Sequence, residues 1–233
     1  GRILVDTLQI HDAVLVGCGW HAYEKHVGAY SALLYRSILS RKLYQSVRDE
    51  YTKAKLEGIG FSNVLNTGCA TMWGFTPDFV EHTEQKAANV ITTITDYNQD
   101  PARDEQMLAT LLNEYETVSL WLQGNGTENT LPLPSFVNAI DSVDIGGVIA
   151  ALDASNTDYV GTRLHGGIRA LQHRRRALII AIDNRAREKR HDFNIPTLER
   201  EDMDRLGNWI EREEATEIRI PIGEIEKFLE QFK

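Results

Sequence analysis

The chain has 233 residues, is 42% hydrophobic, and carries a net charge of -9 with a pI near 5.3. This length fits one large domain or two ordinary ones, and the acidic balance argues against a nucleic-acid-binding protein, whose usual footprint is a basic patch. No run approaches the roughly 20 apolar residues of a membrane-spanning helix, and the two cysteines, Cys18 and Cys69, form no Cys-x-x-Cys pair for zinc or redox chemistry.

The first third of the chain predicts a small α/β unit. An apolar run over 12–16 predicts a buried strand that ends in the turn Gly17-Cys18-Gly19. Further strands are expected over 44–47 and 63–66, and helices over 30–39 and 50–57.

A second strand and helix series follows residues 76–87, which are polar, contain Pro77 and predict a linker. Strands are expected over 89–95, 117–123, 157–161 and 177–182, and helices over 102–115, 144–154, 165–173, 202–211 and 224–232, with Asp183-Asn184 capping one more helix. Alternating strands and helices are typical of parallel, doubly wound sheets. We therefore expect an α/β fold with an N-terminal domain over 1–80, a C-terminal domain over 88–212, and a strand and helix over 213–233 that pack back on the first domain.

The turn from Gly161 to Gly167 is the strongest candidate for chemistry. In open α/β sheets, ligands bind outside the carboxyl ends of the strands, and Arg163, His165, Gly166 and Gly167 follow such an end at the start of a helix. Backbone N–H groups there favour a phosphate or carboxylate, glycines let an anion approach, Arg163 adds a bidentate contact, and His165 can transfer a proton. The alternative is a tight turn with a helix-capping histidine.

Other strand ends supply weaker candidates. Trp20 and His21 follow the first glycine turn, where the tryptophan either stacks on a sugar ring or fills a core. Arg48 and Asp49 form a surface ion pair or, alternatively, a second anion site. Asn125 and Asp183 also follow strands and are candidates to line a cleft.

Other charged residues have a plainer interpretation. The cluster Arg174-Arg175-Arg176 is typical of a solvated helix end. The remaining histidines have no metal-ligand spacing, and no Gly-x-Gly-x-x-Gly or Walker motif is present. We therefore expect neither a metal nor a bound cofactor.

The segment 158–170, with its Arg163-Leu164-His165-Gly166 core, resembles the Arg-x-His-Gly segment of the polysaccharide pyruvyltransferase family. The strand 178–182 that ends in Asp183, and the later 193–196, follow at the spacing of that family. Residues 46–51 are similar to its Arg-Asp segment, and the likeness covers about residues 10–200.

The resemblance implies two Rossmann-like domains arranged as in B-type glycosyltransferases, with an acceptor-binding N-terminal domain and a donor-binding C-terminal one. It implies phosphoenolpyruvate as the donor substrate and a sugar of a cell-surface or exopolysaccharide precursor as the acceptor, joined as a pyruvyl ketal. Arg163 and His165 match its donor-site pair, and Arg48 matches a second donor-binding arginine. The usual opening strand and Asn/Asp-containing glycine loop have no counterpart, which implies an incomplete N-terminal domain.

Two cysteines give no disulfide framework, so we expect a cytoplasmic enzyme, with peripheral association at the inner face of the membrane and a lipid-linked acceptor as further options. A homo-oligomer is also open. Two other functions compete with the pyruvyltransferase: a nucleotide-sugar glycosyltransferase of the same architecture, and an inactive member that binds a glycan.

Overall fold

The computed structural model describes residues 10–75, 85–122, 138–140, 152, 156–212 and 217–233. The chain forms two compact units, each with its own parallel sheet. Unit 1 consists of residues 1–76, 191–194 and 219–233, and unit 2 of residues 77–190 and 195–218. Of the C-terminal segment expected over 213–233, residues 219–233 belong to unit 1. A strand and a helix were expected here. In the described part, residues 217–221 form no strand, and a helix follows from Ile222.

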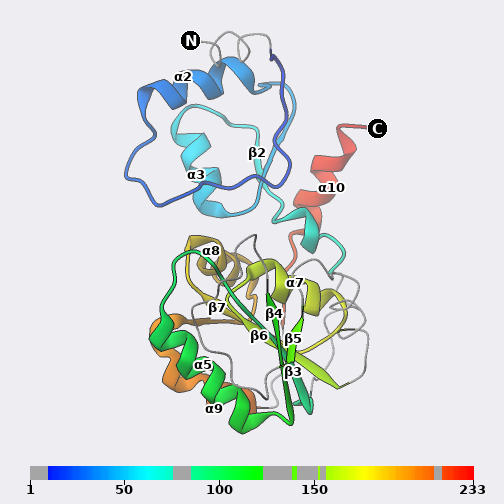
Figure 1. The fold of residues 1–233 in the computed structure, drawn as a ribbon. Helices are drawn as coiled ribbons and strands as arrows, with labels where there is room; N and C mark the ends of the chain where they lie inside the picture. The colour runs from blue at the N-terminus through cyan, green and yellow to red at the C-terminus, as the bar shows by residue number, and fades with distance from the viewer. Residues whose placement is uncertain (1–9, 76–84, 123–137, 141–151, 153–155, 213–216) are drawn as a thin grey trace. The chain divides into compact units, whose positions relative to one another are not determined.

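Unit 1 holds a two-stranded parallel sheet of β1 (Gln45–Val47) and β2 (Val64–Asn66). Its helices are α2 (Ala29–Ile38), α3 (Glu50–Gly58), the 3-10 turn η1 (Ala70–Met72) and α10 (Ile222–Glu230), shown in blue, cyan and red in Figure 1. Apolar side chains from α2, α3 and both strands form its core, including Val47, Leu56 and Phe61.

The strand expected over 12–16 is the main error in unit 1. Only Ala13 makes an isolated bridge, with Leu39. Side chains of β1 accept two amides of this stretch: Leu15 N donates to Gln45 Oε1 at 2.9 Å, and Gly17 N donates to Ser46 Oγ at 2.9 Å, while Ser46 N donates to Leu15 O at 3.0 Å. Because these amides are satisfied by side chains, the segment runs beside β1 without regular pairing.

Unit 2 holds a six-stranded, fully parallel sheet in the order β5-β4-β3-β6-β7-β8. The strands are β3 (Asn89–Ile94), β4 (Thr117–Leu122), β5 (Asn138–Ile140), β6 (Thr157–Gly161), β7 (Ala177–Ala181) and β8 (Thr197–Glu199). Numbered within the unit, this order is 3-2-1-4-5-6, the doubly wound dinucleotide-binding order. The α/β fold with parallel sheets is therefore confirmed. β5 and β8 are short strands that the sequence analysis missed.

The helices of unit 2 cover the sheet on both faces. α5 (Pro101–Glu114) and α9 (Leu206–Glu211), preceded by the 3-10 turn η2 (Arg200–Arg205), lie side by side on one face (Figure 1). Their core includes Val160, Leu178 and Ile180 of the central strands. α7 (Leu164–Gln172) packs on the opposite face, where Tyr159 and Ile179 alternate with those residues. α8 (Asn184–Phe193) starts after β7, where Asp183 Oδ1 accepts from Arg185 N at 2.9 Å as the expected cap.

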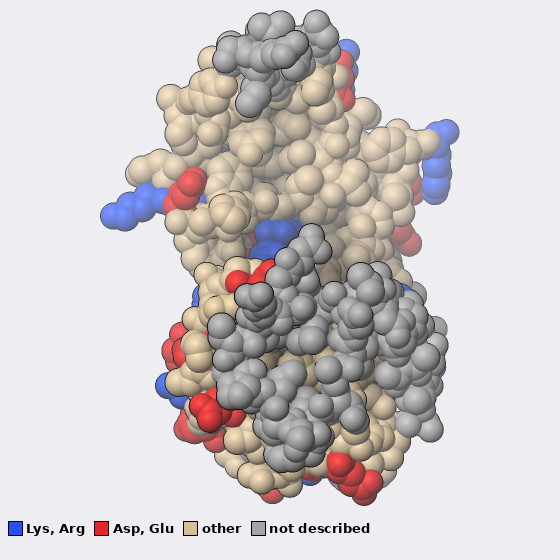
Figure 2. All heavy atoms as spheres, in the orientation of Figure 1, with Lys and Arg blue, Asp and Glu red and all other residues tan. Residues whose placement is uncertain are grey.

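Two sequence expectations lie partly or wholly outside the described residues: the linker at 76–87, described only from residue 85, and the helix at 144–154, of which only Leu152 is described as helical. On the face shown in Figure 2, the described acidic and basic side chains form small separate groups of both signs. Among the described helices, each is too short or too polar to cross a bilayer.

One residue of the arginine cluster after α7 is not solvated as expected, because Arg174 is exposed but Arg176 is buried. The side chain of Arg176 is only 4% exposed and pairs with Asp158 at 3.4 Å. Its guanidinium also donates to the carbonyl of Arg212 at 2.8 Å and lies 4.1 Å from the centre of the Trp209 ring. Arg176 is therefore part of the core that joins β6 to the end of α9, which a local sequence pattern does not reveal.

Candidate active site

The centre of the unit 2 sheet places two strand ends beside each other. β3 and β6 are neighbours, but the chain continues from β3 to β4 on one side and from β6 to β7 on the other. At such a switch point the two connections diverge and leave a crevice outside the carboxyl ends of the strands. The residues that follow these ends are Asp96 and Tyr97 after β3, and Arg163 and His165 after β6. The switch point therefore coincides with the turn that the sequence singled out.

The backbone of this turn is tied to β3. Arg163 N donates to Thr93 Oγ1 at 3.2 Å, and the Tyr159 hydroxyl donates to Arg163 O at 2.8 Å. The hydroxyls of Thr93 and Tyr159 are 2.6 Å apart, which completes a buried relay between the two strands. Burial also raises the pKa of Tyr159, so the phenol keeps its proton. The turn is thus positioned by buried hydrogen bonds on both sides of Arg163.

Gly161 and Thr162 make the close approach of the strands possible. A side-chain carbon at Gly161 would lie 2.6 Å from the Thr93 N atom, so only glycine fits there. Thr162 Oγ1 accepts a hydrogen bond from Thr95 N at 2.9 Å. The loop after β3 and the loop after β6 are therefore fixed to each other.

The Arg163 side chain turns toward the loop after β3. Its Nη2 donates to Asp96 Oδ1 at 2.7 Å, and its guanidinium carbon lies 5.3 Å from the centre of the Tyr97 ring. Asp96 is 51% exposed, so this ion pair is open to solvent. His165 lies in the first turn of α7, and its residue is exposed. The structure thus holds a guanidinium and an imidazole at the same strand end.

Gly166 and Gly167 are buried, and the space beside them is occupied by the sheet. A side-chain carbon at Gly166 would lie 2.5 Å from the Tyr159 hydroxyl, and one at Gly167 would lie 2.4 Å from Ile179 Cγ1. The missing side chains therefore allow α7 to pack closely on β6 and β7. Donor binding by the amides of this first turn remains a prediction.

A second arginine, Arg185, reaches the same loop. Arg185 donates from Nε and Nη2 to Asp183 Oδ2 at 2.9 and 2.5 Å. Its Nη2 also donates to the Tyr97 hydroxyl, and its guanidinium carbon lies 5.6 Å from the centre of the Tyr97 ring. The Asp-x-Arg pattern directly after a strand was the available signal. Asp183 itself, expected to line a cleft, holds Arg185 in place and caps α8.

In unit 1, Arg48 follows β1 and lies over a glycine. Its Nε lies 3.3 Å from Asp49 Oδ2, and its Nη2 donates to Trp20 O at 3.3 Å. A side-chain carbon at Gly19 would lie 1.8 Å from Arg48 Nε, so Gly19 provides the space that the guanidinium crosses. Asp49 also accepts from Thr52 N at 2.7 Å and thereby caps α3. The ion pair considered from the sequence is present, and the pair lies at the carboxyl end of a strand.

The remaining predicted residues occupy different surroundings. Trp20 packs against the core of unit 1, with its ring 5.6 Å from that of Tyr35, and its Nε1 donates to Glu24. His21 is exposed. Asn125 lies outside the described residues. Within the described ranges, no three His, Cys, Asp or Glu side chains gather into a possible metal site.

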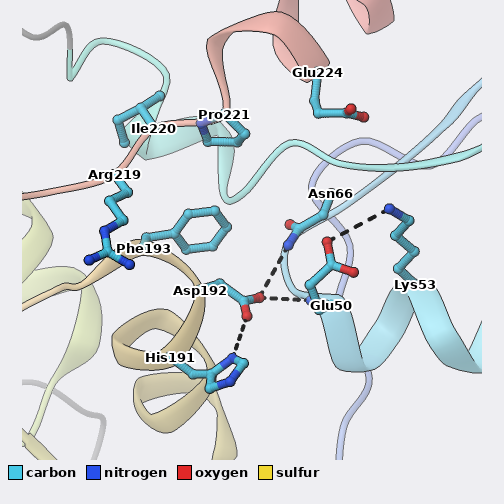
Figure 3. Close-up of a pocket in the computed structure, with 10 residues that line it drawn as sticks. All are labelled: Glu50, Lys53, Asn66, His191, Asp192, Phe193, Arg219, Ile220, Pro221 and Glu224. Atoms are coloured by element: carbon cyan, nitrogen blue, oxygen red, sulfur yellow. Dashed lines mark hydrogen bonds and ion pairs between the residues drawn. The ribbon is translucent and has the colours of Figure 1, made fainter.

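Unit 1 also contains a pocket of about 440 Å³, within the range of about 300–1,000 Å³ that small-molecule sites occupy. In Figure 3, the Asp192 carboxylate points to the amino end of α3 and to Asn66. It accepts from Glu50 N at 2.7 Å, from Asn66 Nδ2 at 3.1 Å, and pairs with His191 Nδ1 at 2.8 Å. Asp192 is only 3% exposed, so this part of the wall is fixed. The remaining wall mixes cationic, anionic and apolar side chains: Lys53, Phe193, Arg219, Ile220, Pro221 and Glu224.

Comparison with solved structures identifies folds of the same kind. UDP-GlcNAc 2-epimerase from Methanocaldococcus jannaschii, in complex with UDP-GlcNAc and UDP, aligns with a TM-score of 0.61 at 11% identity. The alignment covers 100% of this chain and 72% of that one. MnaA from S. aureus, in a co-structure with UDP, aligns with a TM-score of 0.57 at 11% identity, covering 94% of this chain and 66% of that one. At such low identity the likeness concerns the fold alone.

A comparison with curated proteins gives no significant match. The family model described as polysaccharide pyruvyl transferase matches residues 7–184, which include Arg48, Arg163 and His165. The match spans most of the chain and contains the candidate strand-end turns of both units. The chain therefore belongs to the polysaccharide pyruvyl transferase family and is a transferase.

Proposed function

We propose that the protein transfers the pyruvyl group of phosphoenolpyruvate to a sugar of a cell-surface or exopolysaccharide precursor and forms a pyruvyl ketal. The observation that carries the proposal is that Arg163 and His165 both follow the carboxyl end of β6, at the switch point of unit 2. A guanidinium binds a phosphate or carboxylate through paired N–H donors, and an imidazole exchanges protons near neutral pH. These are the two requirements of an anionic enol-phosphate donor.

In the proposed mechanism, Arg163 holds the donor anion and the imidazolium of His165 protonates its methylene carbon. A C–H bond forms at that carbon, and the neighbouring carbon, which bears the phosphate, becomes cationic. One sugar hydroxyl adds to the cationic carbon and loses its proton. A second hydroxyl then displaces phosphate, closing the ketal and releasing a second proton. One of these protons restores His165 and the other leaves with the phosphate, so the products are the ketal and inorganic hydrogen phosphate.

The proposal also assigns Arg48 to the donor, on the basis of its place in the family's Arg-Asp segment. The contacts with Asp49 and with the carbonyl of Trp20 hold its guanidinium in one orientation over Gly19. Such preorganisation suits electrostatic stabilisation, because donors fixed before the reaction need no reorganisation as charge develops. An architecture of two Rossmann-like domains, as in B-type glycosyltransferases, belongs to the same proposal.

For the acceptor, we propose the pocket of unit 1 in Figure 3, with Trp20, His21, Asn125 and Asp183 as further candidates. A sugar hydroxyl both donates and accepts hydrogen bonds. A wall that offers the Lys53 ammonium together with the Glu50 carboxylate suits such groups. A lipid-linked acceptor, peripheral association with the inner membrane face, a cytoplasmic location and a homo-oligomer complete the proposal.

The experiment incubates the protein with phosphoenolpyruvate and a panel of glycans, and follows phosphate release together with the mass of the glycan. His165→Ala is expected to lower kcat by about 10²- to 10⁴-fold, as for the loss of a general acid. Arg163→Ala is expected to raise KM for phosphoenolpyruvate. Arg169→Ala is the matched control, because this arginine lies on the same helix, is exposed, and its guanidinium donates to Gln172.

The alternatives give different outcomes in the same experiment. Unchanged turnover in both the Arg163 and the His165 variants would refute the mechanism. Calorimetric binding of a nucleotide sugar without binding of phosphoenolpyruvate would identify a glycosyltransferase instead. Donor binding without turnover on any glycan would favour an inactive glycan-binding member.

A further inference from the structure

The loop after β3 lies within reach of two guanidinium groups, not one. The Tyr97 ring has the guanidinium carbon of Arg163 at 5.3 Å and that of Arg185 at 5.6 Å from its centre. The two arginines follow different strands, β6 and β7, and meet at an aromatic ring that follows β3. Guanidinium groups repel one another, so their gathering at one ring favours an anion as the third partner.

Arg185 is held so that part of its guanidinium remains available. Asp183 Oδ2 accepts from both Nε and Nη2, and the Tyr97 hydroxyl accepts from Nη2. Among the described residues, Nη1 of Arg185 has no hydrogen-bond acceptor. An arginine carries five N–H donors, so two of them point away from the contacts that fix the side chain. The geometry is that of a preorganised anion ligand.

The loop that carries Tyr97 is held by hydrogen bonds of its own. Thr95 Oγ1 donates to Tyr97 O at 2.9 Å, and Asn98 Nδ2 donates to Ile182 O at 3.4 Å. The buried side chain of Arg200 donates to Asn98 O and to Asp104 Oδ1. The loop after β3 is thus anchored to β7, β8 and α5, and it presents Tyr97 in one position.

Each guanidinium also has a carboxylate partner, and the two carboxylates differ. Asp183 is half-buried and caps α8, so it stays with Arg185. The side chain of Asp96 is half exposed, pairs with Arg163, and lies just after the carboxyl end of β3. An exposed pair of this kind contributes little free energy, about 0–1 kcal/mol, so a substrate anion can displace it.

We propose that Arg163 and Arg185 form a two-arginine clamp on the Tyr97 ring, which binds the phosphate group of the donor, and that Asp96 is the counter-ion that this phosphate displaces. The clamp rests on the proposed function for the identity of its ligand. The binding of a phosphate anion does not depend on it. Asp183 is a positioning residue that orients Arg185.

The test measures binding of inorganic phosphate and of phosphoenolpyruvate to the full chain by calorimetry. Arg185→Gln is expected to weaken binding of both by about 10- to 100-fold, as for the loss of a charge-assisted hydrogen bond. Arg187→Gln is the matched control, because Arg187 lies on the same helix with a similar exposed fraction, 37% against 33%, and pairs with Glu199 instead. This control is expected to bind like the unaltered protein.

A second variant separates ligand binding from a structural role. Asp96→Asn removes the competing charge, so phosphate is expected to bind about 2- to 5-fold more tightly, as for a change of up to about 1 kcal/mol. A purely structural ion pair predicts unchanged or weaker binding. Arg185→Lys keeps the charge but loses the fork geometry, and it is expected to lie between the unaltered protein and Arg185→Gln.

The outcomes separate this inference from the proposed function. Unchanged phosphate affinity in folded Arg185→Gln, or unchanged or weaker binding in Asp96→Asn, overturns the clamp even when pyruvyl transfer is observed. No phosphate binding by the unaltered protein also overturns it. Phosphate binding that depends on Arg185, without any pyruvyl transfer, supports the clamp while refuting the function. Circular dichroism establishes that each variant is folded.

Discussion

Gly167 offers a test of how the helix that carries His165 is seated. Replacing Gly167 with alanine adds one methyl group inside α7, where helix propensity alone predicts a gain of up to about 1 kcal/mol. In the structure, however, this methyl carbon would lie 2.4 Å from Ile179 Cγ1 and 2.8 Å from its Cδ1. Ordinary contacts between carbon atoms are near 3.5–4.0 Å, so α7 and β7 must separate by about 1 Å.

The expected cost follows from how little the neighbours can move. Ile179 is fully buried in β7, which pairs with β6 on one side and β8 on the other. Overpacking of such a core typically costs about 1–3 kcal/mol, and the propensity gain offsets part of it. We therefore expect Gly167→Ala to lower the free energy of unfolding by about 1–2 kcal/mol. Transferase activity should fall as well, since α7 carries His165.

Urea unfolding followed by circular dichroism measures the change, with Gly207→Ala as the control. Gly207 lies in α9 of the same unit, and a side-chain carbon there meets no atom within 4 Å. The control should therefore stabilise the protein by about 0.5–1 kcal/mol. In a background of Ile179→Ala, Gly167→Ala should become neutral or stabilising, because the clashing carbon is gone. A stabilised single variant Gly167→Ala would refute the reasoning.

Three further predictions concern buried polar groups. Asp158→Ala should cost about 3–5 kcal/mol in urea unfolding, because it leaves the buried guanidinium of Arg176 without its carboxylate; a loss below about 1 kcal/mol would contradict this. Burial raises the pKa of Asp158, so its carboxyl ionises at a lower pH in the unfolded chain than in the folded protein. The free energy of unfolding should therefore fall as the pH rises from about 4 through the folded pKa. Asp158→Asn should flatten this pH dependence, and equal slopes in the two proteins would contradict the prediction. Asp192 accepts from Glu50 N at the start of α3, so Asp192→Ala should destabilise this helix end by about 1 kcal/mol. Faster amide exchange at Glu50 measures the effect, and unchanged exchange would show that the Asp192 contact does not support the helix.

Much of the fold follows from local patterns, because its strands and helices bury regular faces. The run Ala177–Ala181 is apolar throughout and forms a strand buried on both sides, as the sequence predicted. The strand Thr197–Glu199 is only half-buried and has no such run, so the pattern gave no signal for it. Residues 12–16 show the opposite error, because an apolar run does not reveal that the side chains of Gln45 and Ser46 will accept from Leu15 N and Gly17 N.

The candidate site divides in the same way. Arg163 and His165 were found because they directly follow a strand and start a helix, which is local information. Tyr97 and Arg185 meet only because β3, β6 and β7 are neighbours in the sheet, and strand order is not written in any local pattern. The same holds for Arg176, whose partner Asp158 lies 18 positions away. Glycines 166 and 167 were recognised as special, but sequence alone does not separate anion approach from helix packing.

Different residues hold the backbone of the turn at Arg163 and contact the Arg163 side chain. Thr93 and Tyr159 hold the backbone of Arg163 through buried hydroxyls, whereas the exposed carboxylate of Asp96 contacts Nη2 of its side chain. A change in the buried relay must therefore alter stability and donor binding together, since the same bonds hold β3 to β6. A change at Asp96 should alter anion affinity alone. Tyr159→Phe and Asp96→Asn are therefore measured together, by urea unfolding and by calorimetric binding of phosphoenolpyruvate. If both variants left donor affinity unchanged, the turn would be a structural feature of the sheet and not a binding site.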